Sequence, residues 1–222
     1  MYNDFFNDDN SNADIIKEKQ ILASIISNGI SSEKASTIVE KLYYKFYNLH
    51  NIVNASENEL LKIKGLNTKK INLIKSIPLI LEYYLLSSLK YDSPHIKKKD
   101  LINYLIIKLG NLKFETFSII CLDMNKRFIS MNHIFRGTID SATIYPRDLV
   151  EKSLSLGSSY VIIAHNHPSG ISKPSKEDIE ITKVLYKAFI MVDVKMLDHI
   201  IIAGNSFYSF KEDGMFDKYR YN

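Results

Sequence analysis

The feature that most constrains the fold is a change in the spacing of apolar residues near residue 100. Before it, apolar residues recur every three or four positions, which is typical of amphipathic helices. After it, segments rich in aromatic and β-branched residues alternate with helical patterns, which is typical of an α/β sheet. The chain of 222 residues is long enough for both. The sequence therefore predicts a small all-α domain followed by an α/β domain.

The first part contains helical patterns separated by short breaks. Residues 14–27 and 31–47 each carry apolar side chains at helical spacing. The next pattern begins with a capping box at Ser56, breaks at Gly65 and restarts at Thr68. This region is therefore predicted to form a helix, a tight turn and a second helix.

The polar segments suggest the domain boundaries. Residues 1–13 are polar and acidic, so we expect a disordered leader, and residues 14–90 should form the all-α module. Residues 91–100 are polar and are predicted to be a linker, in which Pro94 begins the next helix. Residues 101–222 then form the second domain.

The second part contains alternating strand and helix patterns. The first two strands flank the turn MNKR and are expected to form a hairpin. A helix with Pro at its start and Gly at its end follows, and further strands alternate with a second helix. The expected strands are residues 114–123, 128–137, 159–167 and 194–204, and the expected helices are residues 146–157 and 174–192.

Composition and charge exclude several classes of protein. No run of 18 apolar residues predicts a membrane span, and the polar start is unlike a secretory signal, so we expect a cytoplasmic protein. The single cysteine, Cys121, excludes a disulfide framework and a Cys-rich zinc finger, so a bound metal would need His and carboxylate ligands. The net charge of +4 is spread over both halves, which argues against a strongly basic DNA-binding module.

A candidate metal site lies in the stretch IIAHNHPSGISKPSKED, residues 162–178. On an extended strand His165 and His167 point to the same face, about 6 to 7 Å apart at Cα. This spacing suits two ligands of one zinc ion, and the loop that follows has the turn residues needed to bring Asp178 back as a third ligand. Water would then occupy the fourth position.

An alternative explanation accounts for the same residues without a metal. A histidine at the end of a strand is more often a packing or surface residue than a ligand. Ser175 and Asp178 fit the N-cap and third position of a helix, where an acidic residue is favoured. The two explanations are compatible, because a capped helix start also holds an Asp side chain in a fixed direction.

The joint pattern HxHx(7)SxxD, from His165 to Asp178, resembles the signature of JAMM (MPN+) metalloproteases. The motifs HNHPSG and LDHIII, with GTID, YPRDLV and SFYSFKEDG, resemble the bacterial RadC-like (UPF0758) family from about residue 95 to the end. The resemblance implies a JAB/MPN-like mixed β-sheet flanked by helices. It also implies one Zn²⁺ per chain bound by His165, His167 and Asp178, with Ser175 supporting the tetrahedral intermediate.

The resemblance further implies a glutamate near the start of an early strand as general base. Glu115 lies at that place, and no other acidic residue occurs in residues 101–122. Without the resemblance, Glu115 would be interpreted as a solvated residue at a strand end. The implied reaction is attack of a zinc-activated water on an amide or isopeptide bond of a peptide or protein substrate.

The other histidines lack a comparable pattern. Asp198 and His199 are adjacent in a strand and point to opposite faces, so we expect packing or support of the ligands rather than metal binding. His50, His95 and His133 are expected to be structural or exposed, and Cys121 to be a buried apolar residue.

The segment LLKIKGLNTKKINLIKS resembles a helix-hairpin-helix, which offers backbone N–H groups to a DNA phosphate. A DNA contact would then involve Gly65, Asn67, Lys69 and Lys70. Asn67 stands where a glycine is usual, so close approach of a phosphate is in question. A helical bundle without DNA affinity is the alternative.

Two hypotheses about function follow. The first is a RadC-like, JAMM-type metal-dependent hydrolase, and the second is a DNA-binding protein of repair or recombination with a structural or vestigial zinc site. The complete set of ligands, base and serine favours the enzyme, and the even charge distribution argues against a pure DNA-binding protein. The sequence leaves the substrate and the oligomeric state open.

Overall fold

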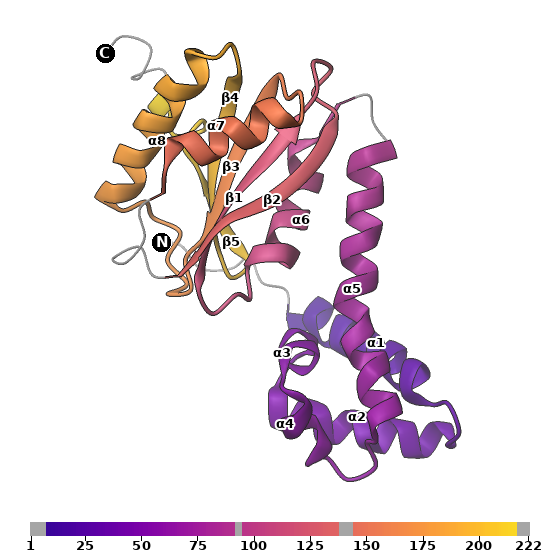
Figure 1. Cartoon of the computed structure of the whole chain (residues 1–222). Helices are drawn as coiled ribbons and strands as arrows, with labels where there is room; N and C mark the ends of the chain where they lie inside the picture. The colour runs from indigo at the N-terminus through magenta and orange to yellow at the C-terminus, as the bar shows by residue number, and fades with distance from the viewer. Residues whose placement is uncertain (1–7, 92–94, 138–143, 217–222) are drawn as a thin grey trace. The chain divides into compact units, whose positions relative to one another are not determined.

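The computed structural model of the chain describes residues 8–91, 95–137 and 144–216 (Figure 1). The chain divides into two compact units, Met1–Ile80 and Leu81–Asn222. The first unit is helical and the second is a mixed sheet with helices, so the predicted fold class is confirmed. No helix in the described part combines the length and apolarity that crossing a membrane requires.

The first unit is a small bundle of helices around one apolar core. The core joins residues from every helix of the unit, among them Leu22, Leu42, Ile52, Leu60 and Ile74, each at most 1% exposed. The helices are α1 (Asp8–Ile26), α2 (Ser32–Phe46), α3 (Leu49–Asn54), α4 (Glu57–Leu61) and the first part of α5 (Thr68–Tyr91).

Two local signals explain the helix–turn–helix region. The Ser56 hydroxyl accepts the N–H of Glu59, and the Glu59 carboxylate accepts the N–H of Ser56 at 2.8 Å, which confirms the predicted capping box of α4. Gly65 then turns the chain with φ +104°, a conformation that favours glycine. The short helix α3 was not predicted, because its capping signal is a single residue, Asn48, which accepts the N–H of Asn51 at 2.8 Å.

Three predicted boundaries differ from the structure. Helix α1 begins at Asp8, inside the expected leader, and residues 1–7 lie outside the described residues. Helix α6 (Lys98–Leu109) begins inside the expected linker, and Pro94, its predicted start, lies outside the described residues. The boundary between the units falls within α5, because Leu89 and its neighbours pack into the core of the second unit.

The second unit is built on a five-stranded sheet in the order β2-β1-β3-β4-β5. Strands β3 and β4 are parallel and joined through α8, and the other neighbouring pairs are antiparallel. The strands are β1 (Glu115–Leu122), β2 (Phe128–Gly137), β3 (Tyr160–Asn166), β4 (Lys195–Ala203) and β5 (Ser206–Ser209), and the helices other than α6 are α7 (Pro146–Ser155) and α8 (Lys176–Ile190).

The alternation of side chains along the strands gives the sheet two cores. On one face Ile119 and Ile163 pack against α7 and α8, and on the other Ile120 and Ile162 pack against α6 (Figure 1). His165 follows Ile163 by two residues and therefore lies on the face covered by α8. The candidate metal ligands are thus brought together on this face at the end of β3.

The turn at Gly65 provides a test of the first unit. A Cβ at this position would lie 2.9 Å from two side-chain atoms of Ile38, in addition to the strain of a positive φ. We expect Gly65→Ala to destabilise the unit by about 2 to 4 kcal/mol. Hydrogen exchange of the α2 amides measures this loss directly.

Gly29→Ala is the matched control. Gly29 has φ +76° and nothing within 4 Å of an added Cβ, so only backbone strain of about 1 to 2 kcal/mol is expected. Equal losses in the two variants would show that the contact with Ile38 is unimportant.

Candidate metal centre

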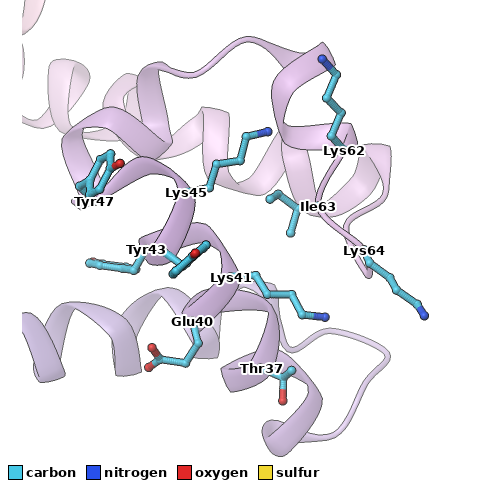
Figure 2. Close-up of a pocket in the computed structure, with 10 residues that line it drawn as sticks. Thr37, Glu40, Lys41, Tyr43, Lys45, Tyr47, Lys62, Ile63 and Lys64 are labelled. Carbon is cyan, nitrogen blue, oxygen red and sulfur yellow. The ribbon is translucent and has the colours of Figure 1, made fainter.

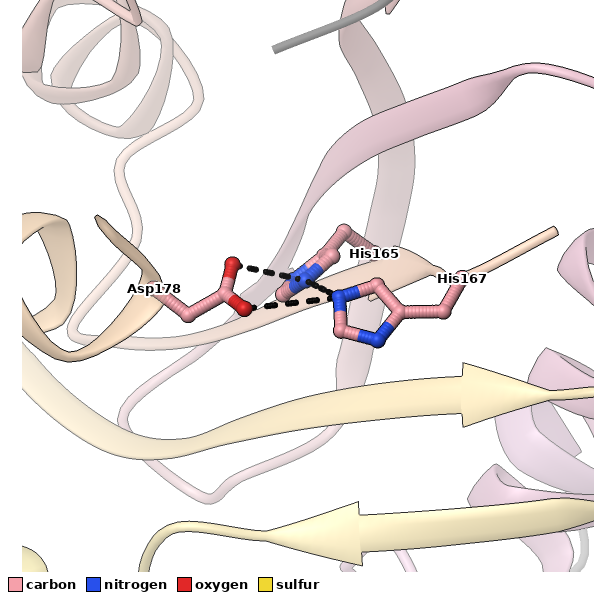
Figure 3. A group of neighbouring side chains, drawn as sticks. All are labelled: His165, His167 and Asp178. Carbon is pink, nitrogen blue, oxygen red and sulfur yellow. Dashed lines mark hydrogen bonds and ion pairs between the residues drawn. The ribbon is translucent and has the colours of Figure 1, made fainter. Parts of the chain in front are cut away.

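Three side chains from β3, the following loop and α8 meet at one point (Figure 3). The Nε2 atoms of His165 and His167 are 3.0 Å apart. His165 Nε2 lies 3.0 Å from Asp178 Oδ1, and His167 Nε2 lies 3.4 Å from Asp178 Oδ2. The structure therefore brings together the three residues that the sequence predicted as ligands.

Backbone contacts hold the two elements that carry these residues. The His167 N–H donates to the Ile202 carbonyl at 2.8 Å, which keeps the loop after β3 against β4. Ser175 and Asp178 form a capping box at the start of α8: the Asp178 N–H donates to Ser175 Oγ at 3.0 Å, and the Ser175 N–H donates to Asp178 Oδ2 at 2.7 Å. The cap thus fixes the direction of the carboxylate.

The hydrogen bond of His167 determines which of its ring nitrogens carries the proton. Its Nδ1 lies 2.8 Å from the Ile171 carbonyl oxygen, which can only accept. Nδ1 must therefore be the donor, and in the neutral ring the Nε2 lone pair faces Asp178 and His165.

A buried chain of hydrogen bonds has the same effect on His165. The Thr182 hydroxyl donates to the Asp178 carbonyl, so its oxygen accepts from His199 Nδ1 at 2.6 Å. His199 Nε2 is then an acceptor for His165 Nδ1 at 2.8 Å. The Nε2 lone pair of His165 consequently also faces Asp178.

Burial and charge explain the ionisation of this group. Burial acts to raise the pKa of Asp178, but hydrogen bonds from His165 and His167, when their rings are protonated, and from Ser175 outweigh it and hold that pKa well below its usual range. Burial, together with the nearby His165, holds the pKa of His199 well below its ordinary value, so this ring is neutral. A charged carboxylate therefore faces two imidazole nitrogens in a site where Asp178 is 2% exposed.

The arrangement fits a tetrahedral metal ion. Two ligand atoms about 2.0 to 2.1 Å from a tetrahedral zinc lie about 3.3 to 3.4 Å apart, close to the 3.0 to 3.4 Å between the donor atoms here. Lone pairs and a carboxylate that face one another repel unless a cation lies between them. A proton is one such cation, and hydrogen bonding to Asp178 raises the pKa of His167; a metal ion is the other.

Glu115 lies at the start of β1, the strand that pairs with the one carrying His165. Phe117 of β1 pairs with His165 of β3, and their rings stack at 5.5 Å between centroids. Continuing this antiparallel register by two residues places Glu115 opposite His167, and the Glu115 charge contributes to the raised pKa of His167. Glu115 Oε2 is buried and has no hydrogen-bond partner within the described residues.

Asn166 is a site residue that the sequence analysis missed. It lies between the two histidines, points to the other face of β3 and is 1% exposed. Its Oδ1 accepts the Thr116 N–H at 2.8 Å, and its Nδ2 donates to the carbonyls of Leu112 and Phe114 at 3.2 Å. Asn166 thus ties the backbone on both sides of Glu115 to the strand that carries the histidines. A polar residue within a buried strand was the available signal.

The remaining residues singled out in the sequence lie outside the group of three ligands. Asp198 Oδ2 accepts from Ser209 at 2.6 Å and its Oδ1 accepts the Lys211 N–H at 3.0 Å, while His199 contacts His165, as expected for residues on opposite faces. His133 Nδ1 bonds the Ser118 hydroxyl at 2.9 Å, and Cys121 is buried.

The four residues predicted to contact DNA differ in their exposure to solvent. Gly65 and Lys69 are at the surface, and Asn67 caps α5 by accepting the Lys70 N–H at 3.0 Å. Lys70 is 6% exposed and its Nζ donates to the Asn28 carbonyl at 3.4 Å. Because its ammonium is directed into the unit, Lys70 does not suit a phosphate contact.

The hydrogen-bond chain through His199 leads to a prediction about metal affinity. His199→Ala removes the acceptor that orients His165, and we expect zinc affinity to fall about 10-fold to 100-fold. Thr182→Val should act in the same direction. Competition with a chromophoric chelator measures the affinity, and His133→Ala serves as control because His133 contacts Ser118 and not the ligands. Unchanged zinc affinity in both His199→Ala and Thr182→Val would show that the hydrogen-bond chain does not position His165.

Comparison with known proteins agrees with this geometry. The family model described as RadC-like JAB domain matches residues 96–215. A UPF0758 protein of Pseudoalteromonas translucida is 34% identical over 91% of this chain and 91% of its own length. A UPF0758 protein of Janthinobacterium is 32% identical over 91% of this chain and 90% of its own length, and one of Aliivibrio salmonicida is 32% identical over 90% and 89%. The chain therefore belongs to the RadC-like (UPF0758) family and carries its JAB domain.

Proposed function

We propose that this chain is a zinc-dependent hydrolase that cleaves an amide or isopeptide bond in a peptide or protein. The observation that carries the proposal is the carboxylate oxygen of Glu115, which is buried without a hydrogen-bond partner among the described residues. A buried polar atom of this kind is costly unless it has a partner in the working state. A water molecule held beside His165, His167 and Asp178 would be that partner.

The ligand set favours zinc. Two imidazole nitrogens and one carboxylate oxygen form a common catalytic zinc set, whereas magnesium and calcium prefer oxygen ligands. When bound, the ion would lower the pKa of a coordinated water and polarise the carbonyl of the scissile bond. We propose one ion per chain, with access from the side of His167, whose side chain is 11% exposed.

We assign the proton transfers to Glu115. Its free Oε2 is suited to accept a proton from the attacking water and to return it to the leaving amine. Asn166 would hold Glu115 in place through its bonds to Thr116 and Phe114. The peptide or protein substrate supplies the carbonyl and the leaving amine.

We assign support of the developing oxyanion to Ser175. Its hydroxyl donates to Asp178 Oδ2 at 2.7 Å in the structure, so this bond would be its resting contact. Donating instead to the oxyanion would require rotation of the hydroxyl proton about the Cβ–Oγ bond, while Ser175 Oγ still accepts the Asp178 N–H and the Ser175 N–H still donates to Asp178 Oδ2.

The alternative, a structural or vestigial site in a DNA-binding protein, is less well supported. A structural zinc site is usually closed by four protein ligands. The group formed by the described residues has three, and the fourth direction is left for water or substrate. The placement of Lys70 also reduces the number of cations available for the expected hairpin contact.

The metal content is the first test. We expect close to one zinc per chain in the purified protein by elemental mass spectrometry, and loss of that zinc in both His167→Ala and Asp178→Ala. His133→Ala should retain it. A wild-type protein that takes up no zinc, even when the ion is added back, would rule out the proposed site.

The base assignment has a separate test. Glu115→Gln preserves the size of the side chain but removes its basicity, so we expect full zinc content with hydrolysis reduced about 10²-fold to 10⁴-fold. A library of fluorescence-quenched peptides with amide and isopeptide bonds measures the rate. Equal rates in the variant and the wild type would exclude Glu115 as the base, and a zinc-loaded wild type that cleaves no member would contradict the proposed substrate class.

A further inference from the structure

An open pocket in the first unit is lined by side chains to which the metal centre and the proposed function give no role (Figure 2). Its volume is about 1050 Å³, and it lies between α2 and the segment that follows α4. Its lining is mostly lysine and tyrosine. The residues that line it are Thr37, Glu40, Lys41, Tyr43, Tyr44, Lys45, Tyr47, Lys62, Ile63 and Lys64.

The pocket is positively charged. Lys41, Lys62 and Lys64 are exposed, and within the described part of the chain they form no ion pair with a carboxylate. Lys45 is engaged, because its Nζ donates to the Glu59 carbonyl at 3.1 Å. The one carboxylate of the lining, Glu40, is paired with Lys19 at 2.7 Å. Three cations are therefore available to an anionic ligand.

Two tyrosine rings of the pocket are almost completely exposed. Tyr44 is 89% exposed and Tyr47 is 81% exposed. The third, Tyr43, has a structural role, because its hydroxyl donates to Glu18 at 2.9 Å and its ring is 7% exposed. Exposed rings beside cations form the combination that binds the bases and the backbone of single-stranded nucleic acids.

The backbone at Tyr47 is strained. Tyr47 ends α2 with φ 72° and ψ −35°, a conformation that glycine adopts without cost and a tyrosine does not. Its N–H donates to the Tyr43 carbonyl at 2.8 Å, and this bond does not require a side chain. An aromatic ring held at a position suited to glycine, and left in solvent, contributes little to the fold and points to a ligand.

We infer that this pocket binds single-stranded nucleic acid, with Tyr44 and Tyr47 stacking on bases and Lys41, Lys62 and Lys64 contacting phosphates. Stacking needs bases that are free of a duplex, so single strands are preferred to duplexes. The site shares Lys62 and Lys64 with the hairpin segment, but it uses their side chains together with α2, whereas the expected hairpin contact uses the backbone amides at the turn, Lys69 and Lys70. It is also independent of the proposed hydrolase.

The test is fluorescence anisotropy of the full chain with a labelled oligothymidine and with the duplex of the same length, over a range of salt concentrations. Single strands should bind more tightly than the duplex. Three phosphate contacts predict a slope of log affinity against log salt concentration of about −2, and Lys41→Ala/Lys64→Ala should reduce its magnitude to about 0.7.

Tyrosine variants separate stacking from simple charge attraction. Tyr44→Ala and Tyr47→Gly should each weaken binding about fivefold or more, and Tyr47→Gly should leave the melting temperature unchanged or raise it. Tyr44→Phe keeps the ring and should keep the affinity. Tyr84→Ala, at an exposed tyrosine outside the pocket, and Lys69→Ala, at an exposed lysine outside it, are the matched controls.

Four results would overturn the inference. The first three are no binding of the single strand at low salt, tighter binding of the duplex, and binding that both tyrosine variants leave unchanged, which would identify an unspecific cationic surface. A loss of affinity in Lys69→Ala as large as in the lysine pair would move the contact to the hairpin and would overturn the inference as well.

Discussion

The arrangement of the second unit depends on a buried carboxylate that faces two imidazole nitrogens. Asp178 is 2% exposed, and a charge with so little access to water must be compensated within the protein. The backbone and hydroxyl of Ser175 provide part of the compensation, and a proton or a metal ion between Asp178 and the rings of His165 and His167 would provide the rest. The hydrogen bonds that lead through His199 and Thr182 back to the Asp178 carbonyl close a ring of contacts between β3, β4 and α8. A metal ion at this point would complete an electrostatic arrangement that the fold has already prepared.

The same arrangement explains why the site lies at the end of β3. The parallel strands β3 and β4 are joined through α8, so the start of the helix returns to the edge of the sheet where β3 ends. The antiparallel neighbour β1 begins at that edge with Glu115, two residues before the pairing of Phe117 with His165. Asn166 uses the other face of the strand to hold the β1 backbone. The end of β3 therefore serves both roles. His165 on one face is a candidate ligand, and Asn166 on the other face holds the backbone around the proposed base, Glu115.

The first unit depends on apolar packing rather than on buried charge. Its apolar core is complete in itself, and its turn depends on a glycine that packs against Ile38. The two exposed tyrosines of the pocket, and its lysines Lys41, Lys62 and Lys64, are not part of this core. Exposed aromatic rings next to unpaired cations are the combination on which the proposed contact with single-stranded nucleic acid rests. The two units thus carry separate chemistry, one built on buried charge and the other on an accessible surface.

The sequence by itself determined the order of helices and strands, the capping boxes at Ser56 and Ser175, and the residues that form the metal group. These features depend on local periodicity, on the residue types that cap helices, and on the i, i+2 spacing that places two side chains on the same face of a strand. It did not reveal α3, the strand β5, the start of α1 or the division of the chain within α5, because these depend on single capping residues or on packing between distant segments. The sequence predicted packing or support of the ligands for His199, but only the tertiary structure decided that its partner is His165. The tertiary structure alone also decided that Asn166 holds the backbone on both sides of Glu115, that Lys70 is buried and that tyrosines and lysines share one pocket. Each of these joins residues far apart in the chain, and no local pattern encodes such a contact.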